Sequence, residues 1–328
     1  MAKKTKKTEV TPTDTNTEIL NKSNIKTNRE FLLLYDAILC NPNGDSDTGN
    51  LPRMDFARNI NLVSDVRVKR DIRTLLKQHH QEEVNDGYEV FVDLYNGKKV
   101  SNQTMLTEMK ITDTDPDQII EICKNRFIDI RLFGHTMAVS SNPPPITGPV
   151  QISWGFSLHP VTLVESKSIT SIMSDGNSTF GDAHKVYYSA IAHYGTVSKI
   201  NAVQTGLTDK DLELFREALI NGVSNNLTTS KLGKTPLLYI EIEHEADSNS
   251  FIGDFRRFIK ETANKKSVKT YQDISLDFSI LIDIINNFPG IKAKQIWSHP
   301  SFKYYDTKGL PEDWPGIGLS KADQYGEN

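Results

Sequence analysis

Long apolar runs and alternating stretches divide the chain into a series of strands and helices. Residues 31–39 form a continuous apolar run of strand length, which is typical of a strand buried on both faces of a sheet. Apolar residues recur at helical spacing from 66 to about 78, and again from 209 to about 221 after a capping Thr208. Alternation or apolar content predicts three further strands, at 147–158, 186–197 and 236–244.

The order of these elements indicates the fold class. Without the segments between them, the chain reads strand, helix, strand, strand, helix, strand. This is the βαββαβ order of the ferredoxin-like arrangement, which also underlies RNA-recognition modules. We therefore predict an α+β fold with a ferredoxin-like or RNA-recognition-motif core that carries large insertions. Because this fold hosts many functions, the order alone assigns none.

Several segments stand outside this core. Residues 1–28 are rich in Lys and Thr and hold no aromatic residue, which predicts a disordered tail before one domain over 29–328. Residues 84–126 read as an insertion with a short hairpin at Asn96-Gly97 and a polar helix, followed by a helix over 125–137. Residues 161–185 are rich in Ser, Thr and Gly and are expected to protrude. Residues 245–328 form a C-terminal extension with a Lys-rich loop and a strand–helix pair at 274–287.

Composition and charge narrow the classes of protein. The chain has 328 residues and a formal net charge of −4, from 38 basic and 42 acidic side chains. A uniformly basic nucleic-acid binder is therefore excluded, although a local basic patch is not. No stretch approaches the roughly 20 apolar residues of a membrane span, and the amino terminus does not resemble a secretory signal. Two cysteines, Cys40 and Cys123, cannot form a disulfide framework, so we expect a cytoplasmic protein that does not bind a membrane.

The helix predicted from residue 66 carries the strongest candidate chemistry. One arc of its surface is apolar, and the adjoining arc holds four cations: Lys69, Arg70, Arg73 and Lys77. Arg67 lies further round, and Asp71 is the only acid inside the helix. We expect these cations to remain unpaired within the helix and to meet phosphates or distant acids. Ser64 at the amino terminus offers a hydroxyl and free N–H groups that also suit a phosphate. A solvated helix face is the simpler alternative.

The loop that precedes this helix contains acidic residues that could bind a metal ion. Asn43, Asp45 and Asp47 have the spacing that opens a calcium loop, but Thr48 and Met54 stand where such a loop needs Gly and an acid. A hydrolytic magnesium site formed by Asp36, Asp45 and Asp47 is a second possibility, although it would need further acids. The histidines are scattered without zinc-ligand spacing, and only His135 and His184 flank candidate functional loops. We expect neither a metal nor a cofactor.

Aromatic residues offer another route to nucleic-acid binding. Tyr187, Tyr188 and Tyr194 fall on a predicted strand, where aromatic rings can stack on bases. Packing in the core is the alternative, and we favour it.

Several motifs resemble a known family. FLLLYDAILCNPNGDSDTGNLPR leading into LVSDVRVKRDIR resembles the CRISPR-associated backbone subunit, the Cas-seven family, of type I-B Cascade, and the type I-C counterpart is close. ITGPVQISWGFSLHPV, FIDIRLFGHTM, AIAHYGTVS, GLTDKDLELFREAL and KLGKTPLLYIEIEH followed by FIGDF agree in order. Together these motifs cover most of residues 30–255. Ser46 departs from the family, which often has proline after NPNGD.

The resemblance implies an RNA-binding subunit without catalytic activity. It implies a palm with the RNA-recognition fold, a finger region at about 84–126 and a thumb hairpin at 161–185, with copies lining up along a CRISPR RNA guide. The expected partners are the guide, target DNA in the assembled complex, further copies of the chain and other Cascade subunits. The expected RNA-binding residues are Asn41, Asn43, Arg53, Ser64, Arg67, Lys69, Arg70, Arg73, Gln151, His184 and Lys185.

Two enzymatic alternatives remain open. Type III backbone subunits cut target RNA with an Asp in the loop after the first strand, and this chain has Asp45 and Asp47 there. A metal-dependent ribonuclease is therefore the main rival. A CRISPR RNA-processing endonuclease would need a catalytic His and a C-terminal glycine-rich loop, and residues 290–328 display neither convincingly.

Overall fold

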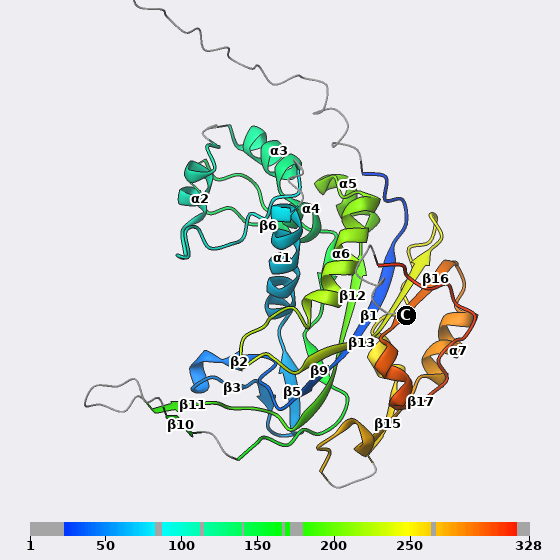
Figure 1. Ribbon diagram of the computed structural model, residues 1–328. Coiled ribbons are helices and arrows are strands. Elements are labelled where there is room, and N and C mark those ends of the chain that lie inside the picture. Colours follow the sequence, from blue (N-terminus) through cyan, green and yellow to red (C-terminus); the bar gives the residue numbers. More distant parts are fainter. Residues whose placement is uncertain are drawn as a thin grey trace, which may run out of the picture.

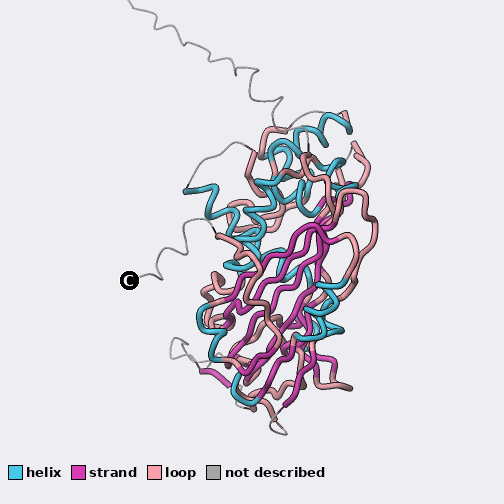
Figure 2. Tube along the Cα trace, turned by 90° about the vertical axis from the view of Figure 1, so that its right-hand side faces the viewer, coloured by secondary structure: helices cyan, strands magenta, loops and turns pink. Residues whose placement is uncertain are grey.

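One large antiparallel sheet runs through the centre of the computed structural model, which describes residues 23–82, 87–111, 115–139, 141–165, 168–170, 180–263 and 267–319 (Figure 1). In this part of the chain the sheet has eight strands, and their bounds and order are as follows: β16 (Ile291–Ser298), β13 (Lys234–His244), β1 (Arg29–Ile38), β12 (Tyr188–Val197), β9 (Gly155–Ser157), β5 (Ile60–Val63) and β4 (Met54–Asp55), with β8 (Val150–Ile152) also paired to β12. Figure 2 shows these strands side by side in a twisted sheet.

Strand β1 lies in the middle of this sheet and is buried on both faces, as its apolar run predicts. Phe31 and Leu33 belong to one hydrophobic cluster, whereas Leu32 and Leu34 belong to a second cluster on the opposite face. This division follows from the alternation of side chains along a strand. The sheet therefore separates two layers of packing.

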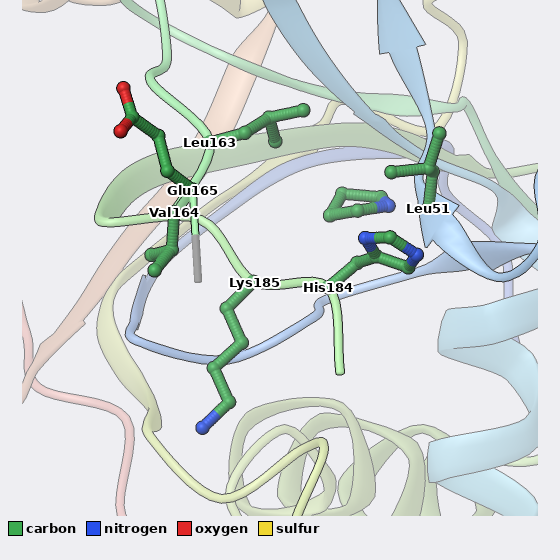
Figure 3. Close-up of a pocket in the computed structure, with 7 residues that line it drawn as sticks. Leu51, Leu163, Val164, Glu165, His184 and Lys185 are labelled. Carbon is green, nitrogen blue, oxygen red and sulfur yellow. The ribbon is translucent and has the colours of Figure 1, made fainter. Parts of the chain in front are cut away.

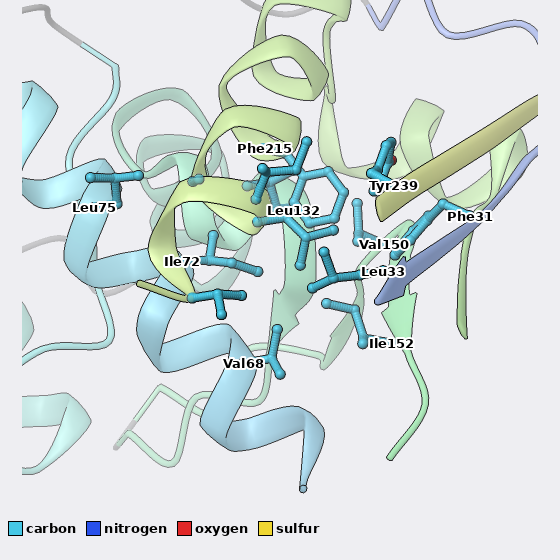
Figure 4. Close-up of a cluster of buried hydrophobic side chains, with 14 of the residues drawn as sticks. Phe31, Leu33, Val68, Ile72, Leu75, Leu132, Val150, Ile152, Phe215 and Tyr239 are labelled. Carbon is cyan, nitrogen blue, oxygen red and sulfur yellow. The ribbon is translucent and has the colours of Figure 1, made fainter. Parts of the chain in front are cut away.

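Two helices, α1 (Asp65–Glu82) and α6 (Asp209–Gly222), cover the first face. Val68, Ile72 and Leu75 of α1 point toward the sheet, where Figure 4 shows them gathered with Phe215 of α6. Full burial of each such side chain contributes about 1.5–3 kcal/mol. Gly222 lets the helices approach closely, because a Cβ there would lie 3.1 Å from the carbonyl oxygen of Asp71.

The C-terminal extension covers the second face. Phe278 and Leu281, at the start of α7 (Ser279–Asn287), pack in the same cluster as Leu238 and Ile240 of β13. A small sheet of β14 (Lys260–Ala263), β15 (Ile274–Asp277) and β17 (Asp306–Lys308) lies beside α7, with short 3-10 turns at Phe255–Phe258, Tyr271–Asp273 and Pro300–Tyr304. The strand–helix pair predicted at 274–287 is confirmed. Strand β16 was not predicted, and it continues the main sheet beyond β13.

The segment predicted as a finger region holds α2 (Asn102–Glu108) and α3 (Pro116–Arg126), and these helices form a third hydrophobic cluster with the following α4 (Ile128–Phe133). The helix predicted over 125–137 is wrong, because Phe127 interrupts it and Gly134 ends α4 with a φ of 68°. A short strand, β6 (Gly134–His135), follows and pairs with β7 (Ile146–Thr147). The predicted hairpin at Asn96-Gly97 is only a tight turn, in which Tyr95 and Lys98 exchange backbone hydrogen bonds of 3.0 and 2.9 Å.

Other predicted boundaries also shift. The strand predicted at 147–158 is broken into β7, β8 and β9, and helix α5 (Lys199–Thr205) was missed. Residues 23–28 do not belong to a disordered tail, since Ile25 is buried in the first cluster and the Asn28 side chain accepts a hydrogen bond of 3.0 Å from the Lys199 N–H. Residues 1–22 of the predicted tail lie outside the described residues.

The segment predicted as a thumb, 161–185, is described at residues 161–165, 168–170 and 180–185. Strands β10 (Ser168–Thr170) and β11 (Phe180–Asp182) pair antiparallel, as expected for a hairpin, and residues 171–179 between them lie outside the described residues. A second small pair, β2 (Gly44–Asp45) and β3 (Leu51–Pro52), flanks a 3-10 turn at Ser46–Thr48. None of the helices in the described ranges combines the length and apolar content needed to cross a bilayer.

Candidate nucleic-acid interface

The loop after β1 folds onto the amino terminus of α1. Asn43 Oδ1 accepts hydrogen bonds from the Ser64 N–H (2.9 Å) and hydroxyl (3.0 Å), and Ser64 Oγ in turn accepts one from the Arg67 N–H (3.3 Å). Asn41 is buried and donates to the Asn50 carbonyl oxygen at 2.8 Å. Three of the predicted RNA-binding residues, Asn41, Asn43 and Ser64, therefore hold the loop in place.

The side chain of Arg53, which follows β3, lies beside an exposed aromatic ring. Its guanidinium group lies 3.1 Å from Asp45 Oδ1 and 5.9 Å from the centre of the Trp154 ring. Trp154 is 46% exposed, while its carbonyl oxygen accepts a hydrogen bond of 2.6 Å from Arg256. An exposed indole beside a guanidinium group is suited to stacking on a base. The sequence analysis missed Trp154, although it stands within the ITGPVQISWGFSLHPV motif.

The cations of α1 are largely paired with acids. Arg73 and Lys77 meet distant acids, which is one of the two expected outcomes. Arg67 and Lys69 pair within the helix, which contradicts the expectation. Lys69 lies 3.0 Å from Asp65 Oδ2, one turn earlier on the same helix. Arg73 Nε lies 2.8 Å from Asp129 Oδ2 on α4. The remaining pairs are Arg67 with Asp71 and Lys77 with Asp93. Asp93 and Asp129 lie outside α1, so a helical wheel of α1 cannot predict these two pairs.

Arg70 differs from its neighbours. Its side chain is exposed and has no ion pair with any residue in the described ranges. Lys69 and Arg73, in contrast, also lie over the ring of Phe133, at 5.5 and 5.1 Å from its centre. Within α1, Arg70 is therefore the cation best placed to meet an external phosphate.

A second loop, between α6 and β13, lies beside the first. Lys231 Nζ donates to the Asn41 carbonyl oxygen (2.6 Å), and the Asn41 N–H donates to the Ser230 carbonyl oxygen (2.8 Å). Gly233 permits this approach, with a φ of 115° and no room for a Cβ, which would lie 2.3 Å from the Ile38 carbonyl oxygen. The sequence analysis missed this loop, whose Lys and Gly residues in SKLGK were its only signal.

Burial sets the charge state of this second loop. Burial, together with the nearby positive charges of Arg67 and Lys234, lowers the pKa of the Lys231 ammonium group to about 8. Lys234 is itself buried and lies 3.0 Å from Asp71 Oδ2. Lys231 is therefore a cation that has no carboxylate partner among the described residues and that titrates near neutral pH.

His184 and Lys185 follow β11, at the end of the segment predicted as a thumb. With Leu51, Pro52 and Leu163 they line a pocket of about 230 Å³, which is shown in Figure 3. The His184 ring points toward Leu51, whereas the Lys185 ammonium group points away from the pocket. The structure thus brings these two residues next to the loop after β1.

Gln151 is not brought to the same place. Its neighbours Val150 and Ile152 point into the cluster under α1 and α6, so Gln151 projects from the other face of the sheet. It pairs with Thr196 near the end of β12, while His184 and Lys185 precede the start of that strand. Its amide donates to the Gly148 carbonyl oxygen at 2.8 Å.

The acids of the loop do not assemble a metal site with Asp36. Asp36 is fully buried on β1 beside the Tyr305 hydroxyl, and burial raises its pKa to about 6. Within the described ranges, no group of three or more His, Cys, Asp or Glu side chains is placed to hold a metal ion. The magnesium arrangement of Asp36, Asp45 and Asp47 is therefore wrong.

The remaining candidates are mainly packing residues. Tyr188 is buried against His159, and the Tyr194 hydroxyl donates to Glu30 at 2.5 Å. His135 packs edge-on against Phe91, and burial lowers its pKa. Of the three tyrosines, only Tyr187 lies outside β12 and outside the hydrophobic clusters.

Comparison with known proteins gives consistent matches. The family model described as CRISPR-associated protein Cas7 matches residues 27–279. A curated CRISPR-associated protein Cas7 from Haloferax volcanii is 26% identical over 329 aligned positions, covering 85% of this chain and 94% of that protein. A chain of a CRISPR RNA-guided surveillance complex in a pre-nicking state matches with a TM-score of 0.50 at 14% identity, covering 83% of this chain and 92% of that one. A chain of another CRISPR RNA-guided surveillance complex gives a TM-score of 0.49 at 13% identity, over 86% and 94% of the two chains.

Proposed function

The chain belongs to the CRISPR-associated Cas7 family, and from this premise we propose that it is the CRISPR RNA-binding backbone subunit of a Cascade surveillance complex. Copies of the chain line up along the guide RNA, together with other Cascade subunits, and support the pairing of the guide with target DNA. The observation that carries this proposal is the meeting of two loops at the amino terminus of α1. They bring Arg53, Lys231 and the exposed Trp154 ring to one region of the surface.

These groups suit a guide that is held by its backbone. Arg70, Lys185 and Lys231 supply positive charge for phosphates, and Trp154 supplies a face for stacking. Asn41, Asn43 and Ser64 act by positioning the loop that carries Arg53. Phosphate contacts carry no sequence information, so base pairing within the complex reads the DNA. The net charge of −4 is compatible with this function, because the cations are local.

The sheet supports a ferredoxin-like core of the RNA-recognition kind. Its central order is β13-β1-β12 followed by β8 and β9, with antiparallel pairing throughout. Helix α1 connects β1 to the β8–β9 side, and α6 connects β12 to β13. Both helices lie on one face, which is the arrangement expected for βαββαβ. The finger region and the thumb are then insertions into this palm, and the type I-B or I-C subtype stays a prediction.

We infer that the subunit acts without catalysis, against the alternative of a ribonuclease that uses Asp45 or Asp47. Asp45 is engaged with Arg53 and accepts a hydrogen bond from the Asp47 N–H at 3.3 Å, which favours a structural role in the loop. Assembled complex incubated with complementary RNA and Mg²⁺ should leave that RNA intact, and Asp45→Ala with Asp47→Ala should leave target binding unchanged. Regularly spaced cuts that disappear in the double variant would establish the ribonuclease instead.

Sequencing of the RNA that co-purifies with the chain tests the main proposal. We expect one population with CRISPR-repeat-derived ends. The absence of bound RNA, or a bulk sample of cellular RNA without repeat sequence, would overturn the assignment as a guide-binding subunit.

A further inference from the structure

Residues 267–268 of the C-terminal extension pack against residues 161–162, which precede the hairpin that we assign as the thumb. Val268 forms a parallel bridge with Val161 and is 2% exposed. The hydroxyl groups of Thr162 and Ser267 lie 2.9 Å apart. Residues 161–164 are linked in turn to the segment that precedes β12, because the Tyr187 N–H donates to the Thr162 carbonyl oxygen at 3.0 Å. Three segments that are distant in the sequence thus meet at one place.

Lys269 is held in a defined position at this junction. The N–H groups of Lys269 and Thr270 donate to Asp273 Oδ2 at 3.0 and 3.1 Å, and Asp273 is buried. The Lys269 ammonium group lies 4.8 Å from the centre of the Tyr187 ring. The backbone at residues 269–270 is therefore held in place, while the Lys269 side chain is exposed to solvent.

The positive charge at this junction has no counter-charge among the residues that the structure describes. Neither Lys185 nor Lys269 has an ion pair with any residue in the described ranges, in contrast to Lys69 and Arg73 of α1. Glu165 lines the same pocket as Lys185, but its carboxylate and the Lys185 ammonium group point in opposite directions (Figure 3). Lys269 lies over the Tyr187 ring, and Lys185 stands two residues before Tyr187 in the chain. Two cations on adjoining segments, neither paired with an acid among the described residues, suit an external chain of phosphates.

We propose that Lys269, supported by Tyr187, forms with Lys185 a second phosphate-binding contact, through which the C-terminal extension holds single-stranded guide RNA at the base of the thumb. This inference rests on the proposed function. It adds residue 269 to the RNA-binding surface. The family match covers this residue, since it ends at residue 279, but the match assigns no function to it.

Salt-dependent RNA binding tests the contact. The purified full-length chain is titrated against a labelled single-stranded RNA of mixed sequence at several salt concentrations. Each phosphate contact contributes a slope of roughly 0.7 in log affinity against log salt, so Lys269→Ala should lower the slope by that amount and the affinity at 0.15 M salt by about fourfold. Lys269→Arg, which keeps the charge, should restore most of the loss.

Lys294→Ala provides the matched control. Lys294 also belongs to the extension and lies 5.8 Å from the centre of an aromatic ring, that of Trp314, but it stands on β16 opposite Ile242, toward the other end of the sheet. Its replacement should leave the slope unchanged. If Lys269→Ala behaves like Lys294→Ala while the wild-type chain binds RNA, the contact is wrong and the proposed function stands. Failure of the wild-type chain to bind RNA overturns both the contact and the proposed function. The same titration is run with double-stranded DNA, and an affinity loss in Lys269→Ala that is seen only with this DNA overturns the assignment of the contact to the guide.

Discussion

Arg73 of α1 and Asp129 of α4 form an ion pair in which Nε and Oδ2 lie 2.8 Å apart. The Asp129 side chain is only 1% exposed, and its two oxygens also accept hydrogen bonds from the Phe91 and Val92 N–H groups at 2.8 and 3.1 Å. Arg73 thus joins the palm to the finger region through a buried carboxylate. Arg73, which the resemblance marks as an RNA-binding residue, therefore has a structural role within the chain.

Replacement of Arg73 by Ala should destabilise the fold. Removal of one partner leaves the buried Asp129 carboxylate without a counter-charge, at a cost of about 3 kcal/mol or more. Urea denaturation followed by circular dichroism measures the loss. A variant as stable as the wild type would show that the pair contributes nothing. The pattern of α1 alone predicts that Lys69, Arg70 and Arg73 can all be replaced without harm to the fold, and the ion pairs contradict this.

Arg70→Ala should have the opposite profile. Arg70 is exposed and unpaired within the described ranges, so its loss should change the unfolding free energy by less than about 0.5 kcal/mol. The slope of RNA affinity against salt should fall by roughly 0.7, as expected for one lost phosphate contact. An unchanged slope would remove α1 from the RNA-binding surface.

Arg70 is exposed, whereas Arg73 is paired with an acid on another helix. This difference illustrates which features can be predicted from the sequence. Strand β1 and helices α1 and α6 follow from periodicity, because burial of one face is a local property of the pattern. The partner of Arg73 lies on another element, and no local pattern reports it. The same holds for Lys231, which reaches Asn41 only because two distant loops meet. Periodicity therefore located β1, α1 and α6, but it could not identify the partner of a charge when that partner lies on a distant element.

Trp154→Ala should weaken RNA binding without changing its salt dependence. Stacking of one base on an aromatic side chain is worth about 1–3 kcal/mol and involves no phosphate. Because the ring is 46% exposed, its loss should cost the fold little. Fluorescence anisotropy at several salt concentrations separates the two effects. Trp154→Phe keeps a stacking face and should retain most of the affinity, and a parallel change in slope would refute a stacking role.

Asp36 should make the stability of the protein depend on pH. Burial raises its pKa from 3.8 to about 6, so between these values the folded state binds more protons than the unfolded state. The free energy of unfolding therefore falls as the pH rises from about 4 to 6, by up to about 3 kcal/mol. Asp36→Asn, which cannot ionise, should lack this decrease. Denaturation of both proteins at pH 4, 5, 6 and 7 measures it, and parallel curves would show that Asp36 is not responsible.

Lys231 should make RNA binding depend on pH in a different range. Burial lowers its pKa to about 8, so its ammonium group loses its proton as the pH rises through that value. A phosphate favours the charged form, and RNA affinity should therefore fall between pH 7 and 9. Lys231→Arg supplies the decisive comparison, because a guanidinium group stays protonated throughout this range. The Arg variant should bind with an affinity that is flat across the range, and Lys231→Ala should be equally flat but weaker. If all three proteins lose affinity in parallel, another group titrates and Lys231 does not contact the guide.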